Sequence, residues 1–445
     1  MPEDLLFSPR PLAPLGNHRP RGRPSAAVLR RRRIVVAVGV IASALLLIVA
    51  VVQLTSPLPL PVVRTSLSSQ MTAPGVAPSL PWPVNGQAAV AVPSAGLLLQ
   101  SAPEQPVPVA SLTKIMTAYV ILVDHPLPTS STGPSVTMTA QDVADLAADE
   151  RANETSIPVR AGEVLNERQL LDGLMVHSAS DFADALARWD SGSVPAFVVR
   201  MNALVASLGL SDTHFADASG YDPSSTSTAA DLLRLATAAM RIPTFAAVVA
   251  QPAVVLPEGG LLVNYLPLVG VDNVVGVKSG FTPQAGGCVV LATRVQIAGQ
   301  SQVALAAVTG QNGFDVLAVA SRLALTLSND AVSGVESVPV ISEGNKVGTA
   351  TTPWSGSDGA LPLLTASSVS VLAWPGERIE TTVSVRGVRL GEQSGAVAAV
   401  ASVDVVPGPQ VGGLVFNDGV EHKTSNLLTQ GVITPPSLFW RLLHS

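Results

Sequence analysis

Residues 106–122 read PVPVASLTKIMTAYVIL, and this stretch decides the fold. It predicts a helix over residues 111–123, with Ser111 and Lys114 near its start. Residues three apart on a helix share a face and lie within contact range. A serine hydroxyl is a weak nucleophile that needs a base, and a lysine becomes one when burial or a second cation lowers its pKa. The helix N-terminus also presents N–H groups to a developing oxyanion.

An N-capping serine followed by a surface lysine would give the same S-x-x-K pattern, so a second segment is needed. Ser178-Ala179-Ser180 interrupts two helical patterns, one ending in GLMVH and the other beginning with DFADALA. The segment therefore fits a site that the helix of Ser111 borders.

A third segment, Lys278-Ser279-Gly280, ends an apolar run and leads into a turn. Lys278 would bring a second cation to the site, and Ser279 would donate to a substrate carboxylate. Gly280 has no side chain, so a substrate backbone can lie close against that strand. The order S-x-x-K, S-x-S, K-S-G places chemistry-bearing residues at three element boundaries.

Around these motifs, residues 86–330 predict an α/β fold in which helical layers cover an antiparallel sheet. Thr228, followed by Asp231, has the form of a helix start. Period-two runs predict strands, and 3.6-residue periodicity predicts helices. The strands are expected at 87–92, 96–100, 276–281, 286–294 and 302–310, and the helices at 111–123, 166–176, 181–189, 197–210, 227–241 and 315–328.

The chain changes character after this region. Residues 335–415 are short β-branched runs separated by Gly, Pro and Ser, which predict a small all-β domain of sandwich or barrel form. Residues 416–445 form a C-terminal tail. Its Phe439-Trp440 pair is expected to pack on the β domain or a neighbouring element, with insertion into a membrane interface as the alternative.

The N-terminal part predicts a membrane anchor. Residues 34–52 are uncharged and mostly apolar, and about 19 residues of helix span roughly 28 Å. Arg30–Arg33 directly precede them, so the basic tail of residues 1–33 is expected in the cytoplasm and the body outside the plasma membrane. A cleaved signal peptide is the alternative, but it has a shorter apolar core and a small-x-small site. Residues 53–85 are Pro-rich and predict an extended spacer.

Composition excludes other classes of protein. Hydrophobic residues make up 47% of the 445 residues and charged residues 13%, so a large core can form. Eight arginines against two acidic residues give residues 1–33 a charge of +6, which leaves −12 on the remainder, since the total is −6. An acidic body argues against nucleic acid as a partner. Because Cys288 is the one cysteine, no intrachain disulfide and no Cys-rich zinc site are possible.

The three motifs resemble the S-x-x-K, S-x-N and K-T-G motifs of the serine D-alanyl-D-alanine carboxypeptidases, the low-molecular-mass penicillin-binding proteins of peptidase family S11. The resemblance extends over residues 81–330 and includes LMVHSASDFADALA, MNALVASLGLSDTHFADASGYD and GVKSGFTPQAGGCVV. It implies a β-lactamase/DD-peptidase-like fold. It also implies a penicillin-binding enzyme of the cell wall that removes the terminal D-Ala from peptidoglycan stem pentapeptides, with β-lactams as covalent inhibitors and no cofactor.

The resemblance also implies roles for individual residues. Ser111 would attack the penultimate D-Ala carbonyl, Lys114 would take the Ser111 proton, and Ser178 would relay a proton to the leaving D-Ala. Lys278 and Ser279 would hold the terminal carboxylate beside Gly280. The backbone N–H groups of Ser111 and Phe281 would form the oxyanion hole, and water would release the acyl-enzyme.

Two residues depart from the family motifs. Ser279 replaces Thr and keeps the hydroxyl. Ser180 replaces Asn and is shorter, with one hydroxyl in place of an amide donor and a carbonyl acceptor. Loss of the asparagine side chain would cost about 2–3 kcal/mol, or roughly 10²-fold in rate. A water would fill part of the space that the shorter serine leaves. A non-catalytic peptidoglycan-binding or scaffold protein is therefore an alternative function, while transpeptidase and endopeptidase activities share the same acylation.

Other polar residues receive simpler interpretations. His177 adjoins Ser178, but without a G-x-S-x-G elbow it is expected to end a helix rather than join a triad. His125 and His214 lack ligand-like neighbours, so no metal site is expected. Glu154 lies between the first two motifs with Glu150, where a β-lactamase would have a deacylating carboxylate. The pattern ERANE does not support that third function.

Overall fold

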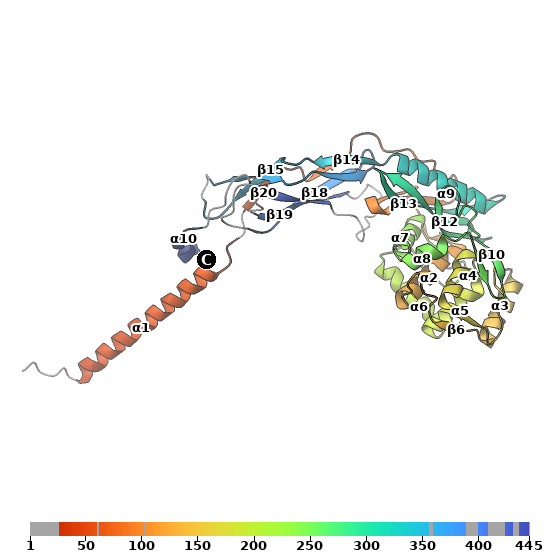
Figure 1. Cartoon of the computed structure of the whole chain (residues 1–445), viewed down its shortest axis with the longest axis horizontal. Helices are drawn as coiled ribbons and strands as arrows, with labels where there is room; N and C mark the ends of the chain where they lie inside the picture. The colour runs from red at the N-terminus through yellow and green to blue at the C-terminus, as the bar shows by residue number, and fades with distance from the viewer. Residues whose placement is uncertain are drawn as a thin grey trace, which may run out of the picture.

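The structure is a computed structural model that describes residues 26–444, apart from 60–61, 102–103, 356–358, 389–398, 408–422 and 430–435. Three parts follow one another in Figure 1: a single long helix, a β region and a region of helices around a sheet. The predicted basic tail lies largely outside the described residues, because only residues 26–33 of it are described, within the long helix α1.

The core of the helical region is a five-stranded antiparallel sheet in the order β11-β12-β13-β3-β4. Helix α9 covers one face, and helices α2 and α7 lie on the other. Along β3, Ala88 and Val90 belong to the hydrophobic cluster under α9, while Ala89 and Ala91 belong to the cluster around α2. Both faces of the strand are therefore buried, and the predicted α/β fold class is confirmed. The bounds of the strands are Gln87–Val92 (β3), Leu97–Gln100 (β4), Val274–Thr282 (β11), Gly286–Ile297 (β12) and Gln300–Gln311 (β13).

The helices lie close to the predicted ranges. Thr228 caps α7, since its hydroxyl accepts from the N–H of Asp231 at 3.1 Å. The bounds are Ala110–Leu112 (the 3-10 turn η2), Thr113–Asp124 (α2), Glu167–Val176 (α4), Ser180–Ser191 (α5), Val194–Ser207 (α6), Ala229–Met240 (α7) and Val316–Ser333 (α9).

Among the elements that were not predicted are two helices, a pair of strands that flanks one of these helices, and a hairpin. The first helix, α3, begins with a capping box in which Thr139 and Asp142 bond each other's backbone N–H groups. Asp142 is acidic, and T-x-x-D is a legible start signal, but the helix lacks a strong apolar stripe. The bounds of these elements are Ala140–Ala152 (α3), Pro243–Val249 (α8), Ser135–Thr137 with Val164–Asn166 (β6 and β7), and Ala253–Leu256 with Gly260–Val263 (β9 and β10).

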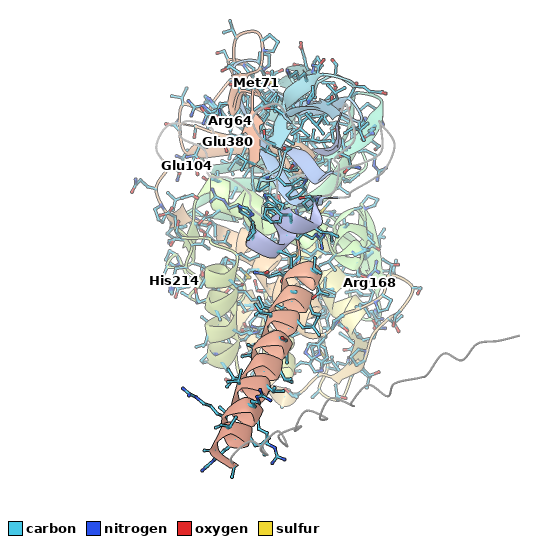
Figure 2. The ribbon with its side chains drawn as sticks, turned by 90° about the vertical axis from the view of Figure 1, so that its left-hand side faces the viewer. Arg64, Met71, Glu104, Arg168, His214 and Glu380 are labelled. Carbon is cyan, nitrogen blue, oxygen red and sulfur yellow. The ribbon has the colours of Figure 1, made fainter. Side chains whose placement is uncertain are left out.

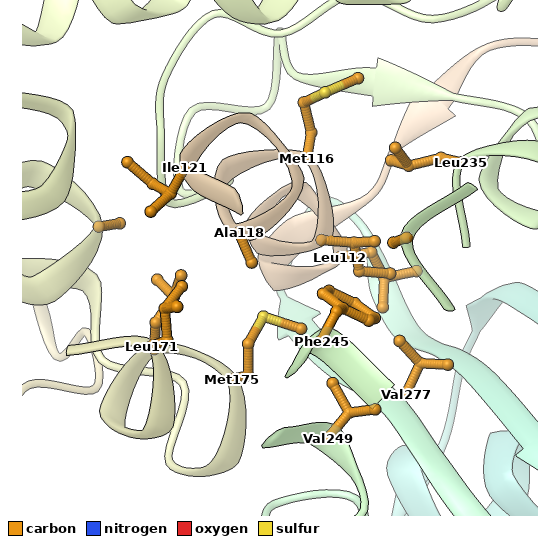
Figure 3. Packing of buried hydrophobic residues seen from close by; sticks show 14 of the residues in the cluster. Leu112, Met116, Ala118, Ile121, Leu171, Met175, Leu235, Phe245, Val249 and Val277 are labelled. Atoms are coloured by element: carbon orange, nitrogen blue, oxygen red, sulfur yellow. The ribbon is translucent and has the colours of Figure 1, made fainter. Parts of the chain in front are cut away.

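Helix α2 runs through the middle of the helical region, and Figure 3 shows its apolar side chains enclosed by neighbours. Leu112, Met116 and Ile121 are fully buried against Leu171 and Met175 of α4, with α7, α8 and β11 around them. These packing contacts hold helix α2 in place and therefore also fix the position of Ser111, just before it.

The β region contains a seven-stranded sheet in the order β1-β15-β16-β20-β19-β18-β2 and the pair β14–β17. Its all-β character confirms the prediction, but its predicted limits at residues 335 and 415 exclude β1, β2 and β20. The bounds are Val62–Thr65 (β1), Gln70–Thr72 (β2), Glu336–Ile341 (β14), Lys346–Thr351 (β15), Leu361–Thr365 (β16), Val369–Ala373 (β17), Arg378–Val388 (β18), Ala399–Pro407 (β19) and Lys423–Thr429 (β20).

The prediction of a strandless spacer over residues 53–85 is wrong for residues 62–72. Strand β1 pairs with β15, and β2 pairs with β18. Figure 2 labels Arg64, Met71 and Glu380, which come from β1, β2 and β18 and lie in one part of the molecule. Short segments next to prolines gain this structure from partners that lie between 283 and 310 residues away in the sequence, so no local pattern predicts them.

Helix α1, Ala26–Thr55, includes the predicted span, is long and apolar enough to cross a membrane, and has no buried residue. The terminal helix α10, Leu438–His444, lies beside its end, where Arg441 donates to the carbonyl of Leu54 at 2.5 Å. Trp440 packs edge-on against Trp354 at 5.5 Å, as expected of a tail on a neighbouring element, whereas Phe439 is exposed.

Candidate active site

The nucleophile candidate Ser111 lies in η2, directly before α2. Ala110 has a left-handed backbone with φ of 50°, which turns the chain sharply before the serine. Such a conformation costs a non-glycine residue about 1–2 kcal/mol and persists only where the surroundings impose it. Ser111 stays partly exposed, whereas Leu112 and Thr113 after it are buried. The hydroxyl is thus presented at the surface of an otherwise closed core.

Lys114 lies at the centre of a hydrogen-bond network. Its Nζ donates to the Oγ of Ser111 at 3.1 Å, to the Oγ of Ser180 at 3.2 Å and to the carbonyl of Ser219 at 2.8 Å. Three acceptors match the three N–H bonds of an ammonium group. The structure therefore brings together the S-x-x-K pair and the last residue of the second motif, which were predicted to share a site.

Burial changes the acidity of Lys114. The side chain is 1% exposed, and desolvation lowers its pKa from 10.5 to about 8. The negative charges of Glu154, Asp217, Asp149 and Asp184 act in the opposite direction and keep the pKa from falling further. A lysine with a pKa near 8 is deprotonated in a useful fraction of molecules at neutral pH, which suits a base.

The third motif lies against the nucleophile. A Cβ on Gly280 would come within 2.8 Å of the backbone nitrogen of Ser111, so only glycine lets β11 approach this closely. Lys278 is 1% exposed, and its Nζ donates to the carbonyl of Ser279 at 2.8 Å. Burial, together with the charge of Lys114, lowers the pKa of Lys278 well below its ordinary value. The carboxylate of a bound substrate would offset the charge of protonated Lys278.

Ser178 and Ser279 are in the site, but their hydroxyl groups do not point at the partners predicted for them. Ser178 is buried with a left-handed φ of 68°, and within the described chain its side chain has no hydrogen bond to Ser111 or Lys114. The hydroxyl of Ser279 donates to the carbonyl of Tyr265 at 2.8 Å, so it must rotate before it can donate to a substrate. Phe281 follows in β11, with its side chain 53% exposed.

The loop of residues 217–221 is a part of the site that the sequence analysis missed. The Asp217 carboxylate accepts from Ser219 Oγ, from the N–H groups of Tyr221 and Asp222, and from Ser225 Oγ, over 2.5–3.1 Å. This fixes the Ser219 carbonyl that Lys114 contacts. The stretch FADASGYD was recognised as similar to the family, but its residues have no chemistry that spacing alone reveals.

The simpler interpretation holds for His177, and the single cysteine is buried. His177 ends α4 and stacks on Tyr265, with ring centroids 4.6 Å apart. Cys288 is fully buried in β12, and burial raises its pKa to about 11. Among the described residues, no group of three or more His, Cys, Asp or Glu could hold a metal ion.

Comparison with known proteins identifies the family. Residues 78–311, more than half of the chain, match the model of peptidase family S11, which is described as D-alanyl-D-alanine carboxypeptidase. The chain belongs to this family. The predicted family and the predicted enzyme class, a serine-type D-Ala-D-Ala carboxypeptidase, are thereby confirmed.

Curated relatives carry related names. The chain is 35% identical over 185 residues to the D-alanyl-D-alanine carboxypeptidase DacB2 of Mycobacterium tuberculosis, covering 40% of this chain and 59% of that enzyme. It is 30% identical over 261 residues to a D-alanyl-D-alanine endopeptidase of Pseudomonas aeruginosa, covering 56% and 79%. The match thus spans less than two thirds of the mycobacterial enzyme.

Solved structures share the fold. Penicillin-binding protein 5 from Haemophilus influenzae is 20% identical with a TM-score of 0.57, covering 81% of this chain and 100% of that one. The Streptomyces K15 DD-transpeptidase is 26% identical with a TM-score of 0.50, covering 58% and 100%. The likeness to penicillin-binding protein 5 covers 81% of this chain, which is a longer stretch than the helical region. It therefore extends beyond that region.

Proposed function

We propose that the protein is a membrane-anchored D-alanyl-D-alanine carboxypeptidase that removes the terminal D-Ala from peptidoglycan stem pentapeptides through an acyl-enzyme on Ser111. The observation that carries the proposal is the contact of the buried Lys114 Nζ with Ser111 Oγ at 3.1 Å in a chain of this family. A base at this distance, with a pKa near 8, can activate a serine at neutral pH.

Acylation follows from the positions of these groups. Neutral Lys114 takes the proton of Ser111 as the oxygen attacks the penultimate D-Ala carbonyl. The N–H groups of Ser111 and Phe281 stabilise the oxyanion, and the close approach of Gly280 to Ser111 supports that pairing. The C–N bond then breaks, and Ser178 passes a proton to the departing D-Ala amine.

The substrate carboxylate is assigned to Lys278 and Ser279. The buried amino group of Lys278 donates to a backbone carbonyl, and a carboxylate partner would raise its lowered pKa again and favour the charged form. A D-amino acid with a free carboxylate thus gains an interaction that an internal peptide bond lacks. Water attacks the acyl-enzyme in the last step and regenerates Ser111.

The location follows from α1 and the arginines before it. We assign α1 as a single-pass plasma-membrane anchor with the N-terminus in the cytoplasm and the catalytic region outside. This orientation is supported by the substrate, because peptidoglycan lies beyond the membrane. Reporter fusions before residue 26 and after residue 430 should report opposite sides.

The first test is mass spectrometry of the full chain in detergent after incubation with penicillin. A stable adduct on Ser111 is expected, and none in Ser111→Ala. The reaction type is then read from products of a cross-linkable stem pentapeptide: free D-Ala alone marks a carboxypeptidase, and dimers mark a transpeptidase. Folded protein without an adduct would reject the proposal and favour a peptidoglycan-binding protein with Ser180 as the disabling change.

A further inference from the structure

Glu154 lies in the segment that joins α3 to β7, next to the second motif. Helix α3 ends at Ala152, Asn153 is left-handed, and the N–H of Glu154 bonds the carbonyl of Asp149 at 2.9 Å. The carbonyl of Thr155 then accepts from the N–H of Ser180 at 2.8 Å. The position of Glu154 is therefore set by backbone hydrogen bonds on both sides.

A second pair of bonds ties the same segment to the site. The N–H of Ile157 donates to the buried carboxylate of Asp181 at 3.2 Å, one residue after Ser180. Tyr221 reaches across from the loop that contains Ser219, with its hydroxyl 3.5 Å from the carbonyl of Ala152. The segment thus lies between the second motif and the loop that Lys114 contacts.

The carboxyl group of Glu154 is half-buried and faces the hydroxyls of Ser180 and Ser219 and the charge of Lys114. Burial raises the pKa of this carboxyl group, whereas the Ser180 hydroxyl, the charge of Lys114 and the Ser219 hydroxyl lower it. Ser219 has a second acceptor in Asp217, at 3.1 Å. Ser180 already accepts from Lys114, so its own proton is available for Glu154.

The direction of the Ser180 hydrogen bond matters for catalysis. A neutral lysine has two N–H bonds and one lone pair, and as a base it must direct the lone pair at Ser111. The Ser219 carbonyl can only accept. A serine hydroxyl can also donate, and a Ser180 that donated to Lys114 would occupy the lone pair. The carbonyl oxygen of the family's Asn cannot donate in this way.

We propose that Glu154 is a positioning residue that lets Ser180 act in place of the motif asparagine. Its carboxylate accepts a hydrogen bond from the Ser180 hydroxyl, so Ser180 presents only a lone pair to Lys114, and the lysine lone pair stays on Ser111. Glu154 does not touch the reacting atoms. The inference rests on the proposed role of Lys114 as the base.

The charge of Glu154 gives a second readout. A nearby carboxylate raises the pKa of Lys114, and Asp217, Asp149 and Asp184 act in the same direction. Removing the charge of Glu154 lowers the pKa of Lys114. Because acylation requires the neutral lysine, its rise with pH should then begin at lower pH.

A double-mutant cycle tests the proposal in the full chain, with the second-order rate constant of acylation by a fluorescent penicillin as the readout. Glu154→Ala should lower that constant about tenfold when residue 180 is Ser, which corresponds to about 1.4 kcal/mol. On the Ser180→Asn background the same change should cost less than about twofold, because an Asn carbonyl needs no acceptor to orient it. Equal losses on both backgrounds would overturn the proposal.

Matched variants separate this role from a structural one. Glu154→Gln keeps an acceptor oxygen, so it should lose less than Glu154→Ala and still shift the pH profile to lower pH. Glu150→Ala, four residues earlier and exposed, should match the natural chain. Unchanged thermal unfolding identifies folded variants.

Two further outcomes would count against the inference. If acylation in Glu154→Ala were unchanged and the adduct decayed more slowly, Glu154 would be a deacylation base instead. If the natural chain formed no adduct, the proposed function would fail together with the inference. A normal adduct combined with additive losses would reject only the role of Glu154.

Discussion

The five-stranded sheet of the catalytic region and the β14–β17 pair of the β region differ in how many of their faces are covered. In β3 of the catalytic region every residue is buried, because α9 covers one face and α2 and α7 the other. In β17 of the β region, Val369, Val371 and Ala373 are buried while Ser370 is exposed. Only the first arrangement excludes water well enough to hold Lys114 and Lys278 nearly unexposed. The contrast teaches that lysine acidity is controlled where a sheet is enclosed on both sides.

The largest predicted effect comes from closing the gap between β11 and the nucleophile. Gly280→Ala places a Cβ within 2.8 Å of the backbone nitrogen of Ser111, so β11 or η2 must move. We expect acylation by penicillin to fall about 10²-fold, since such misplacement disrupts the oxyanion hole. Stopped-flow or gel-based acylation rates measure it.

Gly334→Ala is the control, because the nearest atom to its Cβ is 3.5 Å away and its φ is −89°. If Gly280→Ala reacted at the natural rate, the proposed approach of Gly280 to the reacting atoms would be wrong.

A second prediction concerns the junction of the two regions. Trp374 of the β region is 1% exposed under α9, and its Nε1 donates to the carbonyl of Ala331 at 2.7 Å. Trp374→Ala should lower the free energy of unfolding by about 3–5 kcal/mol. The acylation rate per folded molecule should not change, because the junction lies on the sheet face opposite α2. Chemical denaturation and active-site titration measure the two effects.

Trp374→Phe should lose about 1 kcal/mol, the worth of the indole hydrogen bond. Phe314→Ala, at a position 96% exposed, should have no effect. A loss of acylation in folded Trp374→Ala would show that the regions are coupled.

The smallest effect is a pH dependence of the natural chain. Burial lowers the pKa of Lys114 to about 8, and only the neutral form accepts the Ser111 proton. The acylation rate constant should therefore rise about tenfold per pH unit below pH 8 and level off above it. If the base were instead a lysine on the β14–β17 pair, which is covered on one face, the rise of the rate constant would continue up to the ordinary pKa of lysine. A flat profile between pH 5 and 8 would exclude Lys114 as the base.

The predictable part of the site is the part encoded locally. Ser111 and Lys114 are one helical turn apart, and Lys278, Ser279 and Gly280 are consecutive, so spacing alone groups them. Their mutual approach came from the resemblance to a family. The strands of the central sheet were predicted from short apolar runs such as QAAVAV, and all six residues of that run are buried in the structure.

The remainder depends on contacts between distant segments. The Ser219 carbonyl is 105 residues from Lys114 and is a backbone atom, which side-chain identity does not reveal. Glu154 was set aside because ERANE lacks a pattern, yet the carbonyl of the next residue, Thr155, accepts from the N–H of Ser180 and brings this segment beside the site. Strand β1 pairs with β15 through residues as far apart as Val62 and Thr351. Such pairings are decided by the folded chain as a whole.

With α1 as the proposed membrane anchor, the early entry of the chain into the β sheet limits how far the active site can lie from the bilayer. Six residues separate the end of α1 at Thr55 from β1 at Val62. Fully extended, they span about 20 Å, and α10 at the other end of the chain lies beside the same end of α1. The β region therefore follows α1 after a short linker. With α1 in the membrane, the active site serves one shallow layer of the wall, at a depth set by the length of the β region.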